Sequence, residues 1–90
     1  MYDNSCLNPE YKRPVFINNK GIEWYIDETL TDAANKENDG LPSLNAKCFI
    51  LVKDNNPITR ILIDSNQREL CEDSSFESMA SKIDWLRLNK

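Results

Sequence analysis

The side chains that most often perform catalysis or bind metals are scarce in this sequence. There is no histidine, so the commonest general acid–base group is missing and neither a Cys–His nor a Ser–His pair can form. Cys6, Cys48 and Cys71 are widely separated and include no CxxC pair, whereas structural zinc sites place their ligands in close pairs. We therefore expect no metal ion, and we expect Cys48, which lies in an apolar run, in the core.

Adjacent carboxylates are the remaining candidates for catalysis, because two carboxylates suffice for glycoside hydrolysis. Asp27 is followed by Glu28, and Glu72 by Asp73. Such neighbours point to opposite faces of a strand, or outward into water from a helix or loop. The chain's only two glycines are far apart and form no phosphate-binding motif. We expect a protein without a cofactor that is not an enzyme.

Acidic residues are concentrated in two segments of the chain. Residues 27–39 contain five acidic residues and one basic residue, for a net charge of -4, and residues 64–77 have the same balance. Acidic side chains favour helix N-termini and solvated loops, which would explain much of this pattern without any function. The functional alternative is that one cluster docks on a basic surface, such as the substrate groove of a nuclease, where complementary charge speeds capture.

The candidate partner-binding residues follow from these two clusters. The first cluster consists of Asp27, Glu28, Asp32, Glu37 and Asp39, with Tyr25 as an aromatic anchor beside it. The alternative patch consists of Glu69, Glu72, Asp73 and Glu77. Reversing the charge of the binding cluster is expected to weaken the complex with a partner without unfolding the protein.

Size and overall charge limit the class of protein. Ninety residues make a single small domain, residues 1–90, and 40% hydrophobic residues with 29% charged residues are typical of a globular chain. The net charge of -4 argues against binding a nucleic-acid backbone, which needs a concentrated basic surface. No apolar run is long enough to span a membrane. Because the first residues lack the pattern of a secretory signal, we expect a cytoplasmic location.

Turn chemistry and alternation predict a β-hairpin near the start of the chain, after a loosely ordered arm at residues 1–12. Residues 14–18 and 22–27 are the two strands, and Gly21 closes the turn between them. Ile22, Ile26, Leu30 and Ala33 are also spaced like one helix face, so a helical alternative remains for this segment. A helix is expected to begin near Thr29 and to stop at residues 38–40.

The second half of the chain predicts a meander followed by a helix. Residues 46–53 and 58–64 are apolar on both faces in their middle and are expected to be central strands, and residues 68–71 are a third, shorter strand. A capping box at residues 74–77 precedes an amphipathic C-terminal helix that packs on the sheet. The predicted fold is α+β, with both tryptophans, Trp24 and Trp85, at or near the core.

Small size, acidity and the lack of catalytic groups suit a binding protein. We expect a bacterial immunity protein, the cytoplasmic antidote to a secreted or contact-delivered nuclease-type toxin. One alternative is a phage-encoded inhibitor of a host nuclease or defence complex, with acid mimicking a phosphate backbone. Another is a housekeeping interaction module that binds its partner through a sheet edge or helix groove. In the first two cases the partner is a basic protein, and no nucleic acid or membrane is bound directly.

Overall fold

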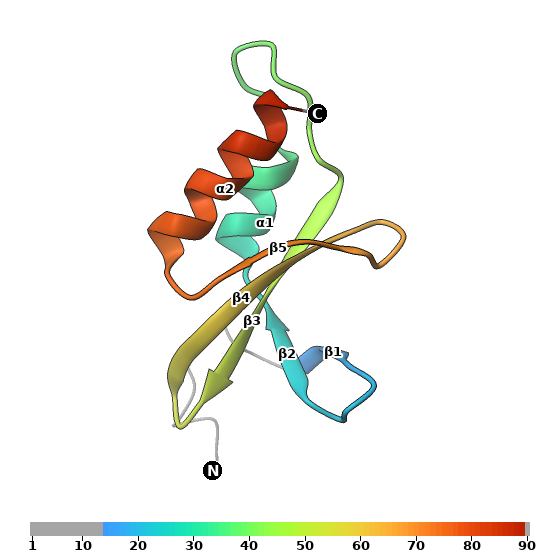
Figure 1. Cartoon of the computed structure of the whole chain (residues 1–90), viewed down its shortest axis with the longest axis vertical. Helices are drawn as coiled ribbons and strands as arrows, with labels where there is room; N and C mark the ends of the chain where they lie inside the picture. Colours follow the sequence, from blue (N-terminus) through green and yellow to red (C-terminus); the bar gives the residue numbers. More distant parts are fainter. Residues whose placement is uncertain (1–13, 90) are drawn as a thin grey trace.

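Five strands that follow one another along the chain form one antiparallel sheet. The computed structural model describes residues 14–89, and Figure 1 shows the sheet with both helices at its upper end. The order in the sheet is β1-β2-β3-β4-β5. The strands are β1 (Pro14–Ile17), β2 (Glu23–Ile26), β3 (Ala46–Lys53), β4 (Asn56–Asp64) and β5 (Glu69–Asp73), and the helices are α1 (Glu28–Asn35) and α2 (Phe76–Leu88). The predicted α+β class is confirmed, and the predicted arm at residues 1–12 lies outside the described residues.

Polar side chains and left-handed backbone positions build the turns between strands. In the β1–β2 turn, the Asn18 side chain accepts from the amides of Lys20 and Ile22, both at 2.9 Å, and Gly21 takes φ +79°. In the β4–β5 turn, Asp64 accepts from the amides of two residues that follow it. Such turns need residues that tolerate positive φ or bind their own backbone. Segment 22–26, for which a helix was the alternative, is therefore a strand from Glu23 onward.

Helix α1 begins one residue earlier than predicted. Asp27 is its N-cap, with the carboxylate accepting from the amide of Leu30 at 3.1 Å. Thr29, the predicted start, lies inside the first turn. The helix ends at Asn35 rather than at residues 38–40, and Lys36 is already extended. The helix ends early because the carbonyl of Ala34 accepts from the amide of Leu44 at 2.9 Å, and not from the next turn of the helix.

Helix α1 replaces β2 along one half of β3. Strand β2 pairs with β3 only at Phe49 and Ile50. Beyond that point, Thr31 Oγ1 accepts from the Cys48 amide at 2.8 Å, and the Asn35 side chain both donates to and accepts from the backbone of Ala46, each at 2.7 Å. Four helix residues rise about 6 Å and two strand residues about 6.7 Å, so side chains four apart match backbone groups two apart.

Helices α1 and α2 run parallel, with both starts near the middle of the sheet (Figure 1). Ser75 is the N-cap of α2. At the opposite end, Arg87 of α2 is buried and donates to carbonyls at and beyond the end of α1. The acceptors are the carbonyls of Ala33, Lys36, Leu41 and Pro42. A cation at the C-terminal carbonyls of a helix is favourable, so Arg87 fixes the loop that leads into β3.

The sheet has an apolar cluster on each face. On the helix side, Leu30 and Ala34 of α1 and Met79 and Ile83 of α2 pack with Ala46, Cys48 and Leu62. On the other side, Trp24, Phe49 and Ile63 form a second cluster. The central place of β3 and β4 is thereby confirmed.

The expectation for the tryptophans is correct for Trp24 and wrong for Trp85. Trp24 is 7% exposed, whereas Trp85 is 62% exposed. The reason is geometric: Met79 and Ile83 occupy the inner face of α2, and Trp85, two residues after Ile83, lies about 200° further around the helix, on its outer side.

Candidate binding surface

Arg60 of β4 joins the starts of the two helices. Its side chain pairs with Asp27 at 3.2 Å and donates to the carbonyl of Ser74 at 3.1 Å, and its guanidinium lies 5.7 Å from the ring centre of Phe76. Arg60 is 7% exposed, so its charge is satisfied almost entirely by these groups. Because Asp27 caps α1 and Ser74 precedes the cap of α2, the two acidic segments meet at this point.

The structure divides the predicted site residues into groups. Six of them belong to the segments that meet at Arg60: Asp27, Glu28, Asp32, Glu72, Asp73 and Glu77. Three lie elsewhere: Glu37 and Asp39 follow the far end of α1, and Glu69 begins β5. Each predicted cluster is therefore split, and the parts that include Asp27 and Asp73 come together at Arg60. Glu72 lies opposite Ile61, on the face of the sheet away from the helices.

Two of the meeting carboxylates are committed to the fold. Asp27 is nearly buried against Arg60. Asp73 pairs with Lys82 of α2 at 3.1 Å, and the hydrogen bonds from Lys82 and from the Ser75 amide lower the pKa of Asp73. In contrast, Glu28, Asp32, Glu72 and Glu77 are exposed. Binding through this surface would therefore depend on the exposed carboxylates.

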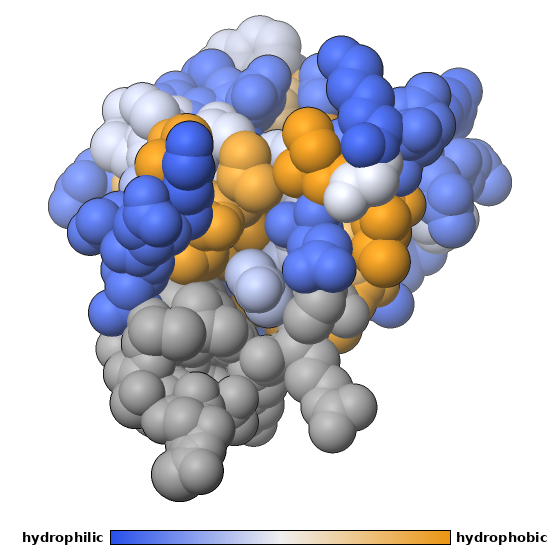
Figure 2. All heavy atoms as spheres, turned by 90° about the horizontal axis from the view of Figure 1, so that it is seen from below, coloured by the Kyte–Doolittle hydropathy of each residue, from blue (hydrophilic) through white to orange (hydrophobic). Residues whose placement is uncertain are grey.

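Partly exposed apolar side chains lie beside these carboxylates. The helices cover only the upper part of the sheet (Figure 1). We call the surface of Tyr25, Val52, Ile58 and Phe76, the first residue of α2, the uncovered end, because among residues 14–89 neither helix extends over it. Tyr25 lies opposite Ile50, and Ile50 opposite Arg60, so the uncovered end is continuous with the helix starts. Ile58 is 46% exposed and Phe76 is 39% exposed. Figure 2 shows hydrophobic side chains exposed between hydrophilic ones at this end of the molecule.

A shallow depression separates β2 from the end of β3 at the uncovered end. Its volume is about 610 Å³. Its lining residues are Gly21, Ile22, Glu23, Tyr25, Leu51, Val52, Lys53 and Ile58. Tyr25, which the sequence predicted as an aromatic anchor, lines this depression. Sequence reasoning missed Ile58 and Arg60, because a strand pattern does not show where the helices stop covering the sheet.

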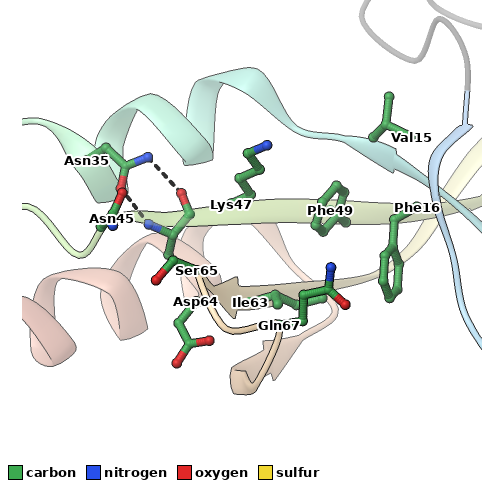
Figure 3. A pocket seen from close by; sticks show the side chains of 11 residues that line it. Val15, Phe16, Asn35, Asn45, Lys47, Phe49, Ile63, Asp64, Ser65 and Gln67 are labelled. Carbon is green, nitrogen blue, oxygen red and sulfur yellow. Dashed lines mark hydrogen bonds between the residues drawn. The ribbon is translucent and has the colours of Figure 1, made fainter.

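A second depression lies on the opposite face of the sheet. It has a volume of about 380 Å³, and Figure 3 shows Phe16 and Phe49 on its apolar side. Their rings are stacked with centres 5.2 Å apart. Lys47 and Gln67 contribute to its polar lining. No predicted site residue belongs to this depression.

The two described cysteines are free thiols, Cys48 buried and Cys71 partly buried. Burial, with a smaller contribution from Asp27, raises the pKa of Cys48 to about 12. Burial also raises the pKa of Cys71, whose sulfur lies 3.6 Å from that of Met79. Across residues 14–89 there is no group of three potential metal ligands of the His, Cys, Asp or Glu type. Neither thiol has the lowered pKa of a nucleophilic cysteine.

Comparisons with protein-family models, curated proteins and solved structures find no match for this chain. In the part of the chain that the structure describes, neither helix is long and apolar enough to cross a bilayer.

Proposed function

We propose that this protein binds and neutralises a basic protein partner in the cytoplasm, as an immunity protein does with a nuclease-type bacterial toxin. The observation that carries the proposal is the meeting of the two acidic segments at Arg60, beside the uncovered end. Glu28 and Glu77 are exposed carboxylates in the first turns of the two helices, and Tyr25, Ile58 and Phe76 are partly exposed apolar side chains of the uncovered end. Apolar centres with a charged rim are typical of protein interfaces.

The charge of this surface supports a basic partner. The exposed charged side chains of α1 and α2 are Glu28, Asp32, Glu77, Lys82 and Asp84. Lys82, the one cation among them, is bonded to Asp73. A surface with one sign of charge accelerates encounter with a partner of the opposite sign and rejects partners of its own sign. A nuclease groove, which must hold phosphates, presents such a basic surface.

A lysate pull-down combined with charge reversal tests the proposal. The bait is the wild-type protein or one of two double variants, Glu28→Lys with Glu77→Lys, or Glu37→Lys with Asp39→Lys. Both variants change the net charge equally, but the second pair lies beyond the far end of α1. Bound proteins are identified by mass spectrometry and assayed for nuclease activity with and without the bait.

The expected result is one basic partner that high salt releases, that the first variant fails to capture and that the second variant retains. Its nuclease activity should fall when wild-type protein is added. A partner retained at high salt, equal loss with both variants, or a partner without inhibitable nuclease activity would contradict the proposal.

A further inference from the structure

A groove between β5 and α2 is distinct from the uncovered end. Its volume is about 360 Å³. It is lined by Leu70, Cys71, Glu72, Lys82, Trp85 and Leu86. Trp85 is 62% exposed and Leu70 is 36% exposed, although large apolar side chains gain most from burial. The groove therefore presents an apolar surface beside a strand.

Strand β5 is an outer strand of the sheet. Among the described residues it pairs with β4 alone, so its other edge faces the groove side. The carbonyl of Glu72 accepts from Lys82 Nζ at 2.7 Å, so a cation of α2 already binds one acceptor of this edge, and an added strand would have to displace it. An unpaired edge is a template for another strand, and peptide recognition often adds a strand in this way.

The charge of β5 selects the occupant. Glu69 and Glu72 are exposed carboxylates on the strand. Antiparallel pairing of β5 with a second copy of β5 would bring these carboxylates near their counterparts, and like charges across strands are destabilising. A strand rich in lysine or arginine would instead form favourable pairs with the same two residues.

We infer that the groove binds an extended basic segment of a partner protein as an added strand on β5. The backbone of the segment pairs with the β5 edge, its cations lie against Glu69 and Glu72, and an apolar side chain contacts Trp85. The inference does not rest on the proposed function: it uses none of the residues of the uncovered end, and Glu72 is the one predicted site residue of the segments meeting at Arg60 that it shares.

A peptide titration followed by ¹⁵N NMR tests the inference. The probe is a capped peptide of alternating lysine and valine with the length of β5, which is five residues. One control peptide alternates glutamate and valine, and the other has proline in place of the valines. The lysine–valine peptide should shift the amide signals of β5 and the indole signal of Trp85 in a saturable way. The indole signal of Trp24, which is 7% exposed, should stay in place.

Two variants sharpen the test. Glu69→Lys with Glu72→Lys should weaken binding of the lysine–valine peptide at least about fivefold and create binding of the glutamate–valine peptide. Trp85→Ala should weaken binding without unfolding the protein, because the side chain is exposed. The inference is overturned if the signals that shift belong to Tyr25 and Phe76, if the proline peptide binds equally well, or if no signal shifts. Shifts of β5 that depend on protein concentration alone would show that a second copy occupies the groove instead.

Discussion

Asp27 connects two elements through one carboxylate. One oxygen caps α1 by accepting from the Leu30 amide, and the other pairs with Arg60. A sequence shows an acidic residue before a helix, but it does not show that a buried arginine from a later strand lies within reach. Asp27 was therefore predicted as a partner contact, whereas the structure gives it a stabilising role.

Substitution of Asp27 separates these two roles. Asparagine caps a helix as well as aspartate, so Asp27→Asn retains the cap and loses the charge opposite Arg60. We expect the free energy of unfolding to fall by about 2 kcal/mol, and by about 1 kcal/mol more in Asp27→Ala, which also loses the cap. Urea denaturation measures both, with the exposed Glu28→Gln as control. Equal stability of Asp27→Asn and wild type would show that the ion pair contributes nothing.

Cys48 makes stability depend on alkaline pH. Its pKa is about 12 in the folded protein, against 9.0 for a free thiol. Because the pKa is raised, the Cys48 thiol of the folded protein keeps its proton at pH values at which the unfolded protein has lost it. The contribution of Cys48 is thus complete below about pH 9 and is lost as the pH rises towards 12.

The slope of this effect is about 1.4 kcal/mol per pH unit while only the unfolded thiol ionises. We expect the free energy of unfolding, measured in urea with a reductant, to fall more steeply between about pH 9 and pH 11 in wild type than in Cys48→Ala. Comparing wild type with Cys48→Ala cancels the effect of the other titrating groups on stability, including that of Cys71, because both proteins contain these groups. Parallel curves for the two proteins would contradict the burial of an un-ionised thiol.

At the level of elements, the sequence predicted strands better than helix ends. Alternation and turn residues identified every strand of residues 14–89, including the third strand of the meander, whose position is Glu69–Asp73 rather than 68–71. The end of α1 was misplaced because the carbonyl of Ala34 accepts from the Leu44 amide instead of from the next helical turn. That contact joins residues distant in the chain, and no local pattern indicates it.

Helix α1 pairs with β3 through the side chain of Asn35, in the place of a neighbouring strand. An alanine substitution at this position is therefore expected to destabilise the protein although alanine favours helices. Alanine has a higher helix propensity than asparagine, so Asn35→Ala would stabilise an isolated helix. In this protein it leaves the N–H and C=O of Ala46 without their partner. We expect the free energy of unfolding to fall by about 1–3 kcal/mol, and the Ala46 amide to exchange its hydrogen faster.

Thr29→Ala is the matched control, because Thr29 is in the same helix and exposed. It should leave the stability unchanged or slightly higher. The proposed role of α1 at the edge of β3 is wrong if Asn35→Ala and Thr29→Ala have the same free energy of unfolding and the same rate of hydrogen exchange at the Ala46 amide.

At the level of the whole molecule, the candidate surface was only partly predictable. Charge clustering identified the acidic segments, but their meeting depends on two parallel helices whose starts share Arg60. Arg60 and Arg87 are both buried, although arginine is usually exposed. Each arginine forms hydrogen bonds with groups from segments distant in the chain. The periodicity of the local sequence therefore does not predict that either side chain is buried. The exposure of Trp85 is the converse case, because an apolar residue in an amphipathic helix is normally expected inside.

The clustered charge of the helices has a cost in stability that can be measured. Glu28 and Asp32 are exposed and four residues apart on α1, an arrangement in which like charges repel. Asp32→Lys converts this repulsion into attraction in the favourable orientation, with the acid on the N-terminal side. We expect the free energy of unfolding to rise by about 0.5 kcal/mol, and Asp32→Asn to give an intermediate value.

The same substitution is expected to weaken binding of the basic partner, since it places a cation on the proposed surface. The dissociation constant, measured by calorimetry, should rise more for Asp32→Lys than for Asp32→Asn. Opposite changes in stability and affinity would mean that the acidic surface is maintained for recognition at the expense of the fold. If Asp32→Lys instead lowers stability, or leaves affinity intact, the acidic residues of α1 are ordinary solvated surface and the binding site must be sought elsewhere, first in the groove beside Trp85.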